Sequence, residues 1–249
     1  MKKNIFLFDV DGTLVESGDV ISNENAKTLN KLKENPNNEI GIVGGGDIKK
    51  IMYQMDNQIF FDHYFSECGC VYHTLDNNNN LVEKYKKNIR NHILYLKINR
   101  LIKKALEFLS QVDYTITGHF IDLRCGIIYI SLIGMTATNE EREYFKNIDK
   151  KEKIRQQLLK ILLKEAEKIG IEESVSILEG GSVGISIYPV EYDKIQVLET
   201  ISKDKYNIFY FGDKYLPSGN DYKLLTNENV TGYKINKKEE TFDILKQFL

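Results

Sequence analysis

Short apolar segments that end in acidic, glycine-rich turns recur along the chain. The clearest examples are residues 5–9 (IFLFD), 40–47 (IGIVGGGD) and 207–213 (NIFYFGD). Uninterrupted apolar runs of this length are typical of strands buried on both faces of a parallel sheet. We therefore expect three such strands. In a doubly wound sheet their carboxyl ends can meet at one edge, where ligands usually bind.

Amphipathic segments separate these strands. Ala26, Leu29 and Leu32 recur at helical spacing, and Ser22 stands where a residue can cap the first turn of that helix. The remaining patterns predict helices at residues 48–55, 193–198, 222–225 and 241–249, strands at residues 71–72 and 230–233, and a hairpin tip at residues 76–80.

The middle third of the chain departs from this rhythm. The change begins at about Glu83. The patterns that follow predict a helix through residues 93–109, strands at 115–123 and 127–133, a helix at 139–169, and a strand pair at 174–178 and 183–188. Alternating helices and paired strands indicate an inserted domain rather than a continuation of the parallel sheet. We therefore expect a core in two pieces, residues 1–83 and 189–249, and a second domain at residues 84–188.

Composition limits the classes of protein to which this chain can belong. Its net charge of −2 provides no general attraction to nucleic acid or anionic lipid. No apolar run approaches the length of a membrane span, and the run after the N-terminal lysines is too short for a signal peptide. Cys68, Cys70 and Cys125 are too few, and odd in number, for a disulfide framework. A cytoplasmic protein is expected.

The turn after the first apolar segment carries the main candidate chemistry. Asp9 and Asp11 stand two residues apart at the end of a predicted strand, and two such carboxylates can share Mg²⁺. One of them can attack a phosphorus atom while the other transfers a proton. Gly12 and Thr13 can bring backbone and hydroxyl groups to a phosphate. The alternative is an ordinary surface turn, because Asp and Gly are common in turns.

A second glycine-rich turn follows the next predicted strand. Gly44, Gly45 and Gly46 precede Asp47 and a helical pattern. A glycine loop that leads into a helix N-terminus can cradle a phosphate, although the same residues also suit a tight strand-to-helix connection. The residues alone leave both interpretations open.

Several longer stretches are similar to a known family. They are residues 9–13 (DVDGT), 40–47 (IGIVGGGD), 120–134 (FIDLRCGIIYISLIG), 139–155 (NEEREYFKNIDKKEKIR) and 211–221 (FGDKYLPSGND). On these residues the chain resembles the haloacid-dehalogenase-like (HAD) phosphotransferases and, within them, the eukaryotic-type phosphomannomutases. The resemblance implies an α/β fold, with a Rossmann-type core around a parallel sheet and an inserted α+β cap domain with an antiparallel sheet. It also implies an active site between core and cap, and Mg²⁺ as cofactor.

The resemblance also implies a role for each matching residue. Asp9 would be the nucleophile that becomes a phosphoaspartate, Asp11 the general acid/base, and Lys194 the cation beside the phosphoryl group. The implied magnesium ligands are Asp9, Asp11 through its backbone, Asp213 and Asp221. The implied substrate contacts are Gly45, Gly46, Gly184 and Ser186, with Arg124 and Arg142 on the far phosphate. An arginine fork suits phosphate geometry, although Arg142 among its glutamate neighbours also fits a solvated helix face.

The chain departs from the family pattern at several expected contacts. Met135 stands in place of a phosphate-binding arginine, and Gly46 in place of a serine. Gly184-Ile185-Ser186 replaces a sugar-reading triplet that contains a carboxylate. Another arginine is replaced near Gly18, and Asn227 stands where a second cation site usually has an aspartate. Because the altered positions are those that read the sugar, the sequence leaves open which hexose phosphate is preferred.

The leading expectation from the resemblance is a phosphohexomutase. It would interconvert mannose 6-phosphate and mannose 1-phosphate, with glucose phosphates as further candidates, and feed GDP-mannose synthesis. The reaction would pass through a phosphoaspartyl enzyme and a hexose 1,6-bisphosphate, which would also act as activator. The family forms homodimers through the cap, and no nucleic-acid or membrane partner is expected. The rivals are a HAD-type sugar-phosphate phosphatase, in which water accepts the phosphoryl group, and a catalytically weak sugar-phosphate-binding protein.

Overall fold

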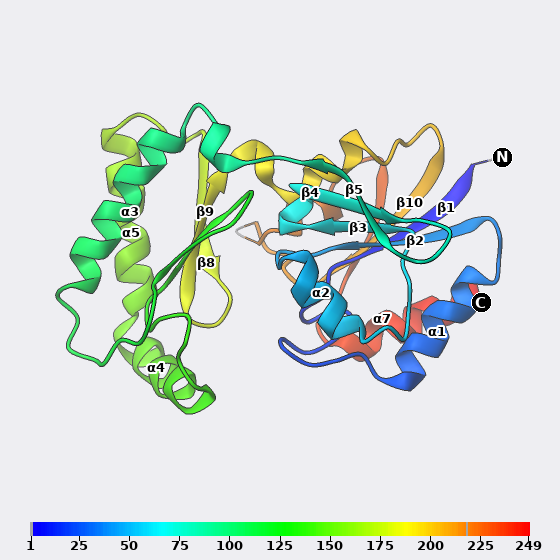
Figure 1. Ribbon diagram of the computed structural model, residues 1–249, viewed down its shortest axis with the longest axis horizontal. Coiled ribbons are helices and arrows are strands. Elements are labelled where there is room, and N and C mark those ends of the chain that lie inside the picture. Colours follow the sequence, from blue (N-terminus) through cyan, green and yellow to red (C-terminus); the bar gives the residue numbers. More distant parts are fainter. Residues whose placement is uncertain (1, 218) are drawn as a thin grey trace. The chain divides into compact units, whose positions relative to one another are not determined.

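The computed structural model describes residues 2–217 and 219–249, which divide into two compact units (Figure 1). The core comprises the residues up to Lys87 together with Glu191–Leu249, and the cap comprises Asn88–Val190. The core holds a mixed, mostly parallel sheet and the cap a separate antiparallel sheet, which confirms the expected α/β class with an inserted α+β domain. Among the described residues, no helix is both long enough and apolar enough to cross a membrane.

The core sheet brings the three expected apolar strands together as neighbours. Its strand order is β11 (Val230–Lys234), β10 (Tyr206–Gly212), β1 (Lys3–Phe8), β2 (Asn38–Val43), β3 (His63–Ser66), β4 (Val71–Leu75) and β5 (Leu81–Lys86). The first five strands in this order pair in parallel, whereas β4 and β5 are antiparallel. The carboxyl ends of β10, β1 and β2 therefore lie at one edge, as the sequence predicts.

Burial on both faces explains why β1 is apolar at successive positions. Phe6 and Phe8 stack on Phe209 and Phe211 of the adjacent β10, with ring centroids 4.8 and 5.0 Å apart. These two β1 side chains face the helices α1 (Asn23–Lys33), α2 (Ile48–Met55) and α7 (Lys238–Leu245), which lie on the same side of the sheet (Figure 1). The 3₁₀ helix η4 (Lys194–Glu199) and α6 (Tyr222–Leu225) cover the other face. Burying one such aromatic side chain contributes about 1.5–3 kcal/mol to stability.

The cap of α1 and the tip of the β4–β5 hairpin lie where the sequence indicates, whereas α7 begins at Lys238, three residues before the expected closing helix. Ser22 accepts a hydrogen bond from the Asn25 amide and so caps α1. Asp76 accepts the amide hydrogens of Asn78 and Asn80, which fixes the expected hairpin tip between β4 and β5. The smaller 3₁₀ elements are η1 (Glu67–Gly69) and η5 (Lys246–Phe248). Ser218, in the expected loop before α6, lies outside the described residues.

The cap is a sheet with helices packed against it. Its strand order is β6 (Ile121–Leu123), β7 (Ile128–Ser131), β9 (Gly184–Pro189) and β8 (Val175–Gly180), with antiparallel pairing throughout. The helices are η2 (Ile89–Asn91), α3 (Tyr95–Leu109), α4 (Asn139–Glu152) and α5 (Ile154–Lys168), and η3 (Val190–Tyr192) follows β9. Figure 1 shows α3 and α5 side by side, and α5 contacts both β8 and β9.

Residues 84–87, which the sequence placed in the second domain, belong to the core. Residues 83–86 belong to β5, where Tyr85 packs against Tyr72 of β4 with ring centroids 5.4 Å apart. The predicted helical pattern of residues 93–109 forms α3, which begins at Tyr95, whereas residues 81–86 pair with β4 as an added edge of the core sheet. The divisions between core and cap consequently fall after Lys87 and after Val190, whereas the sequence placed them after residues 83 and 188.

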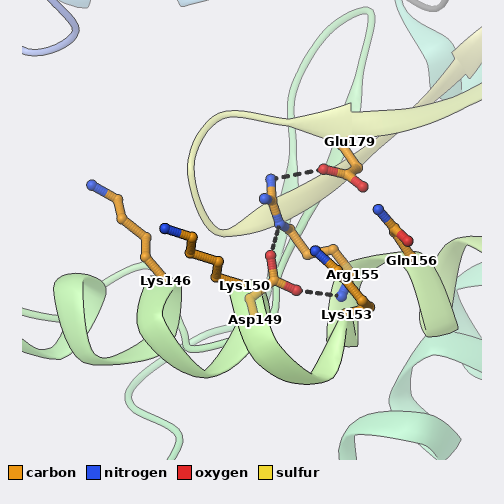
Figure 2. A pocket seen from close by; sticks show the side chains of 7 residues that line it. All are labelled: Lys146, Asp149, Lys150, Lys153, Arg155, Gln156 and Glu179. Carbon is orange, nitrogen blue, oxygen red and sulfur yellow. Dashed lines mark hydrogen bonds and ion pairs between the residues drawn. The ribbon is translucent and has the colours of Figure 1, made fainter.

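The expected helix 139–169 is two helices, α4 and α5. They meet at Lys153, whose φ of 58° lies in the left-handed region that interrupts a right-handed helix. Figure 2 shows the junction, where Asp149 accepts hydrogen bonds from the Arg155 amide and side chain. Arg155 also reaches Glu179 of β8 at 3.2 Å. These side chains line a pocket of about 230 Å³. The junction is fixed by contacts of Arg155 with Asp149, six positions earlier, and with Glu179 of β8, which helical periodicity does not reveal.

The expected strand 115–123 is shorter in the structure. Only Ile121–Leu123 joins the cap sheet as β6. Gly118 has a φ of 66° and turns the chain out of the extended conformation before that strand. The preceding residues keep single backbone contacts beside β7, such as the Thr117 amide to the Ile133 carbonyl at 2.8 Å. The β-type sequence pattern of residues 115–123 therefore predicted a longer strand than the structure forms.

Candidate active site

Three carboxylates meet at the carboxyl edge of the core sheet. Asp9 follows β1, Asp213 follows β10, and Asp221 precedes α6. One carboxylate oxygen from each lies within 4.8 Å of the other two. Asp9 and Asp221 are buried, and Asp213 is half-buried. The cluster forms because adjacent parallel strands β1 and β10 end at the same level, and the Asp9 amide donates to the Phe211 carbonyl at 2.9 Å.

Lys194 compensates the negative charge of this cluster. Its Nζ lies 2.5 Å from Oδ1 of Asp9 and 2.7 Å from Oδ1 of Asp221, and the side chain is almost fully buried. Asp193 caps η4 directly before it and so fixes the start of the element that carries Lys194. A buried ammonium requires such partners, because an isolated charge in a protein interior is strongly unfavourable. The structure thus brings together two catalytic residues implied by the resemblance, Asp9 and Lys194.

Burial and neighbouring charges set the protonation of the pair. Burial raises the pKa of the Asp9 carboxyl, Lys194 opposes this rise, and the carboxylates of Asp221 and Asp213 add to it. Burial alone would lower the pKa of Lys194, but Asp221 and Asp9 hold it well above its usual range. Lys194 is therefore a fixed cation at neutral pH. The carboxylate of Asp9 depends on nearby positive charge to stay ionised.

Tyr210 is a member of the site that the sequence did not indicate. It lies on β10, is fully buried, and donates a hydrogen bond from its hydroxyl to Oδ1 of Asp221. The same hydroxyl lies 3.4 Å from Nζ of Lys194. The other oxygen of Asp221 accepts the Lys214 amide at 2.9 Å. Tyr210 lies within an apolar run of the sequence. The one feature that could have indicated it is the hydroxyl group of a tyrosine at a strand position expected to be buried.

The donor set at this edge fits a hard divalent cation such as Mg²⁺. The ligand atoms offered by Asp9, Asp213 and Asp221 are all carboxylate oxygens, which Mg²⁺ prefers. Oδ1 of Asp213 is buried and has no hydrogen-bond partner among the described residues. A buried carboxylate oxygen without a donor is unfavourable unless a cation or water reaches it. Asp213 therefore supplies an acceptor that a bound metal ion would satisfy.

Asp11 occupies a different position from the other acidic residues. Its carboxylate accepts hydrogen bonds from two α2 side chains, Nζ of Lys50 at 2.5 Å and Nε2 of Gln54 at 2.8 Å. The turn that follows Asp11 is closed by a hydrogen bond from the Gly12 amide to the Val15 carbonyl at 2.7 Å. The side chain of Asp11 is not part of the carboxylate cluster around Asp9. Neither Lys50 nor Gln54 was singled out from the sequence.

The glycine loop after β2 is held from the side of β3. The Gly44 carbonyl accepts the Cys68 amide and the Gly46 carbonyl accepts the Glu67 amide, each at 2.9 Å. Glu67 and Cys68 adopt φ values of 50° and 57°, which are strained for residues with a Cβ atom. Such strain persists where surrounding hydrogen bonds determine the backbone. A Cβ at Gly45 would meet only Asn220 and Cys68, at 3.8 Å.

Asp47, at the end of that loop, serves the helix rather than the carboxylate cluster. Its Oδ1 accepts the Lys50 amide at 2.8 Å and so caps α2. The carboxyl edge therefore gathers acidic side chains from β1, β10 and the loop before α6, but not from β2. The acidic residue at the end of the second apolar segment is explained by helix capping.

In the cap, the two expected arginines are held in different ways. Arg124, after β6, pairs with Asp122 at 2.7 Å and lies over the Tyr129 ring, 5.7 Å from its centroid. Arg142, in the first turn of α4, donates to the carbonyls of Ala137 and Met135 at 3.1 and 3.0 Å. Arg142 is thus anchored to the loop that carries Met135. Its glutamate neighbours suggested a side chain in solvent, but the guanidinium of Arg142 is bound to backbone carbonyls instead.

The altered triplet of β9 lies beside β7. Gly184 pairs with Ser131, and Ser186 pairs with Tyr129. A Cβ atom at Gly184 would overlap the Tyr129 ring, so the tyrosine fills the space that a side chain at residue 184 would need. Burial raises the pKa of Tyr129, and Arg142 and Arg124 oppose that rise. Gly184 and Tyr129 are therefore structurally linked, because the Tyr129 ring and the Ile130 carbonyl occupy the space that a side chain at residue 184 would need.

Two other departures have local structural explanations. Gly18 has a φ of 92°, in the region that favours glycine, and no atom lies within 4 Å of a Cβ placed there. Asn227 accepts the Asn229 amide at 3.0 Å and fixes the turn before β11. Asn227 and Asp221 both belong to the core, but only Asp221 joins the carboxylate cluster.

Comparison with known proteins gives one consistent result. The family described as "Eukaryotic phosphomannomutase" matches residues 25–249. The phosphomannomutase of Saccharomyces cerevisiae is 33% identical over 249 residues, which covers 98% of this chain and 94% of that protein. Phosphomannomutase 1 of Dictyostelium discoideum is 33% identical over 248 residues, 98% of this chain and 95% of that protein.

A comparison of structures concerns the fold alone. The chain is similar to an N-terminally truncated, IMP-bound IMP-nucleotidase of Plasmodium falciparum, with a TM-score of 0.63 and 16% identity. The match covers 99% of this chain and 68% of that one. Identity at this level carries no information on substrate, and the match supports only the fold, an α/β core with an inserted second domain.

Proposed function

The chain belongs to the eukaryotic phosphomannomutase family, and from this premise we propose that it interconverts mannose 6-phosphate and mannose 1-phosphate. Matches over almost the whole chain support this activity over that of a sugar-phosphate phosphatase. The structural observation that carries the chemistry is the pairing of buried Asp9 with Lys194 at 2.5 Å. It places a carboxylate and a permanent cation together at the edge of the sheet where ligands bind.

Asp9 is the nucleophile in this proposal. One oxygen of its carboxylate forms a bond to phosphorus while the bond from phosphorus to the donor oxygen breaks, which yields a phosphoaspartate and the free sugar hydroxyl. The cycle of a hexose monophosphate starts from this phosphoaspartate. In one half, a free hydroxyl of the monophosphate attacks phosphorus, the bond from Asp9 to phosphorus breaks, and a hexose 1,6-bisphosphate forms. In the other half, Asp9 takes the other phosphoryl group from the bisphosphate, which releases the isomeric monophosphate and restores the phosphoaspartate. Lys194 orients Asp9 and offsets charge as the phosphoryl oxygens approach. The hexose 1,6-bisphosphate formed between the two halves would also serve as activator.

Asp11 moves the proton. When the sugar oxygen leaves phosphorus, Asp11 donates a proton to it, and when a sugar hydroxyl attacks the phosphoaspartate, Asp11 accepts the proton. The carboxylate can take this role because it stands apart from the cluster around Asp9, on the α2 side of the same turn. Gly45 and Gly46 are proposed to bring backbone amides to the phosphate of the core.

Asp9, Asp213 and Asp221 are the residues that would hold Mg²⁺, together with the backbone of Asp11. When bound, Mg²⁺ supplies positive charge that offsets repulsion between the attacking carboxylate and the phosphoryl oxygens. The buried Oδ1 of Asp213, which has no hydrogen-bond partner in the described part of the chain, supports this assignment. Lys194, which is paired with Asp9 and Asp221, supplies a further part of the positive charge from the chain itself.

The cap is proposed to hold the phosphate that is not reacting. Arg124 and Arg142 carry guanidinium groups, whose geometry suits a phosphate, and Ser186 and the backbone of Gly184 are proposed to contact the sugar. Met135 cannot provide the charge of an arginine, so the distal phosphate is expected to bind less tightly. Three further parts of the proposal rest on family membership. They are a homodimer through the cap, a cytoplasmic location, and a supply of mannose 1-phosphate to GDP-mannose synthesis.

A product assay tests this function directly. The protein is incubated with mannose 1-phosphate, with and without added hexose 1,6-bisphosphate, and mannose 6-phosphate and free phosphate are both measured. Formation of mannose 6-phosphate in excess of free phosphate, stimulated by the bisphosphate, is the expected result. Release of free phosphate without mannose 6-phosphate would assign the protein to the phosphatase alternative. Glucose 1-phosphate in a parallel assay determines the sugar preference.

A further inference from the structure

The carboxylate of Asp11 is held by two side chains of one helix. Nζ of Lys50 lies 2.5 Å from its Oδ2, and Nε2 of Gln54 lies 2.8 Å from its Oδ1. Residues 50 and 54 are four positions apart on α2 and therefore project from the same side of the helix. Each donates to a different oxygen of Asp11. The two contacts together fix both the position and the plane of the carboxylate.

The burial of Gln54 indicates that this contact has a purpose beyond packing. Gln54 is 1% exposed and has Ile51 and Met55 as buried apolar neighbours on the same helix. A carboxamide at such a position is unfavourable unless its polar atoms find partners. The partner of its amide nitrogen is Asp11. An apolar residue would suit the core at this position, so the amide is explained by the carboxylate that it contacts.

Lys50 reaches Asp11 because the glycine loop leaves room for it. A Cβ atom at Gly46 would lie 3.0 Å from Cδ of Lys50, so the lysine stem runs over that glycine. The ion pair is partly exposed, with 40% and 36% of the two side chains accessible. Pairs exposed to this extent contribute little to stability. The main effect of the pair between Lys50 and Asp11 is therefore to fix the position of the Asp11 carboxylate.

We propose that Lys50 and Gln54 are positioning residues that aim the carboxylate of Asp11 at the sugar oxygen. The inference rests on the proposed role of Asp11 as general acid/base. A carboxylate offers about four lone-pair directions, so two donors from α2 still leave one on each oxygen for the substrate proton. Without those donors the side chain can rotate, and proton transfer becomes slower because it requires hydrogen-bond geometry.

The choice of phosphoryl donor separates positioning from structural support. A hexose phosphate needs a proton on its leaving oxygen when the bond from phosphorus to oxygen breaks. Acetyl phosphate does not, because acetate leaves as an anion while the same bond from Asp9 to phosphorus forms. Loss of positioning should therefore slow turnover of hexose phosphates and spare formation of the phosphoenzyme from acetyl phosphate. A general disturbance of the core should slow both.

The experiment compares Gln54→Met and Lys50→Met with Asp11→Asn as benchmark. Lys49→Met is the matched control, because Lys49 is an exposed lysine of the same helix. For mannose 1-phosphate with the bisphosphate, kcat is expected to fall about tenfold or more in both test variants, within the range for general acid–base catalysis. The rate of phosphoenzyme formation from acetyl phosphate should change less than about twofold, as should both rates in Lys49→Met.

Equal losses on the two donors, or a kcat on mannose 1-phosphate that stays within twofold of the unmodified protein, would overturn the positioning role. Melting temperatures identify a variant that has lost its fold, and Lys50→Met, at a partly exposed site, carries the test if Gln54→Met does not fold. The benchmark separates the two levels of the argument. If only Asp11→Asn loses activity on mannose 1-phosphate while keeping phosphoenzyme formation from acetyl phosphate, Lys50 and Gln54 are not positioning residues. Absence of selectivity in Asp11→Asn removes the proposed role of Asp11 as well.

Discussion

Lys194 and Asp9, which are 185 positions apart in the sequence, are joined by a contact of 2.5 Å in the interior of the core. The aspartate belongs to the piece of the core that precedes the inserted cap in the sequence, and the lysine belongs to the piece that follows it. Both side chains are buried, and neither would be stable there without the other. The contact therefore links the chemistry of the site to the closure of the two core pieces.

Replacing Lys194 is expected to destabilise the protein as well as inactivate it. In Lys194→Met, Asp9 and Asp221 would lose the cation that lies 2.5 and 2.7 Å from them. Breaking a buried pair by removing one partner costs about 3–5 kcal/mol, because a charge is left uncompensated. Urea unfolding at neutral pH measures this loss, and the exposed Lys203→Met serves as control. A free energy of unfolding equal to that of the control would contradict the account.

Asp9→Asn is expected to abolish turnover and preserve the fold. The amide has nearly the shape of the carboxylate and can still accept a hydrogen bond from Lys194, but it cannot form a phosphoaspartate. Loss of a covalent nucleophile reduces turnover by several orders of magnitude. Steady-state assays with mannose 1-phosphate, alongside circular dichroism, test both parts. Retention of more than about a tenth of the activity would remove Asp9 as nucleophile, given that expected effect.

Activity is expected to require Mg²⁺, and the metal should also stabilise the fold. Adding Mg²⁺ to metal-free protein should raise the melting temperature, because binding to the native state alone shifts the unfolding equilibrium. Asp213→Asn should weaken both effects, since it alters the carboxylate whose Oδ1 lacks a partner among the described residues. Metal content is measured after chelation. Full activity in demonstrably metal-free protein would exclude the proposed site.

Replacing a cap arginine tests whether the cap binds the second phosphate of the substrate. Arg142→Ala is expected to raise KM for hexose phosphates about tenfold or more, because a charge-assisted contact is worth roughly 1.5–3 kcal/mol. Turnover of acetyl phosphate, which has no second phosphate, should change little. Since Arg142 also donates to the carbonyls of Ala137 and Met135, its melting temperature is measured in parallel. Equal kinetic losses on both substrates, with unchanged stability, would show that Arg142 does not read a second phosphate.

Glu39 gives a prediction about pH and stability at the opposite end of the sheet. Burial alone would raise the pKa of its carboxyl, but hydrogen bonds from Lys3, His63 and Tyr206 lower it from 4.5 to about 2. A carboxyl whose folded pKa is depressed stabilises the fold above its unfolded pKa and loses that contribution as the pH falls. The contribution of Glu39 is therefore complete above about pH 4.5 and disappears as the pH falls through about 2.

Glu39→Gln tests this expectation. At pH 7 it should lower the free energy of unfolding by roughly 1.5–3 kcal/mol, the usual worth of hydrogen bonds to a charged group. The difference from the unmodified protein should shrink as the pH falls from 4.5 towards 2. Urea unfolding at several pH values measures it, with the exposed Glu34→Gln as control. A difference that does not vary with pH would mean that the charge of Glu39 is not what stabilises the fold.

The sequence by itself determined the frame of the protein and the place of its chemistry. Apolar runs before Asp9 and Asp213 predicted parallel strands, and parallel strands must end at one edge, so the two carboxylates had to be near each other. Patterns of this kind are local, and short loops allow few topologies. The motifs around these residues also indicated the family, which the comparisons confirm.

Only the tertiary structure decided which groups contact one another. The partners of Asp11 on α2, the hydrogen bond from Tyr210 to Asp221 and the dependence of Tyr129 on Gly184 join residues that no periodicity connects. The same holds for residues 84–86, which the sequence placed in the second domain and which pair with β4 in the core sheet as part of β5. Side-chain chemistry fixes what a residue can do, whereas burial and long-range neighbours fix what it does.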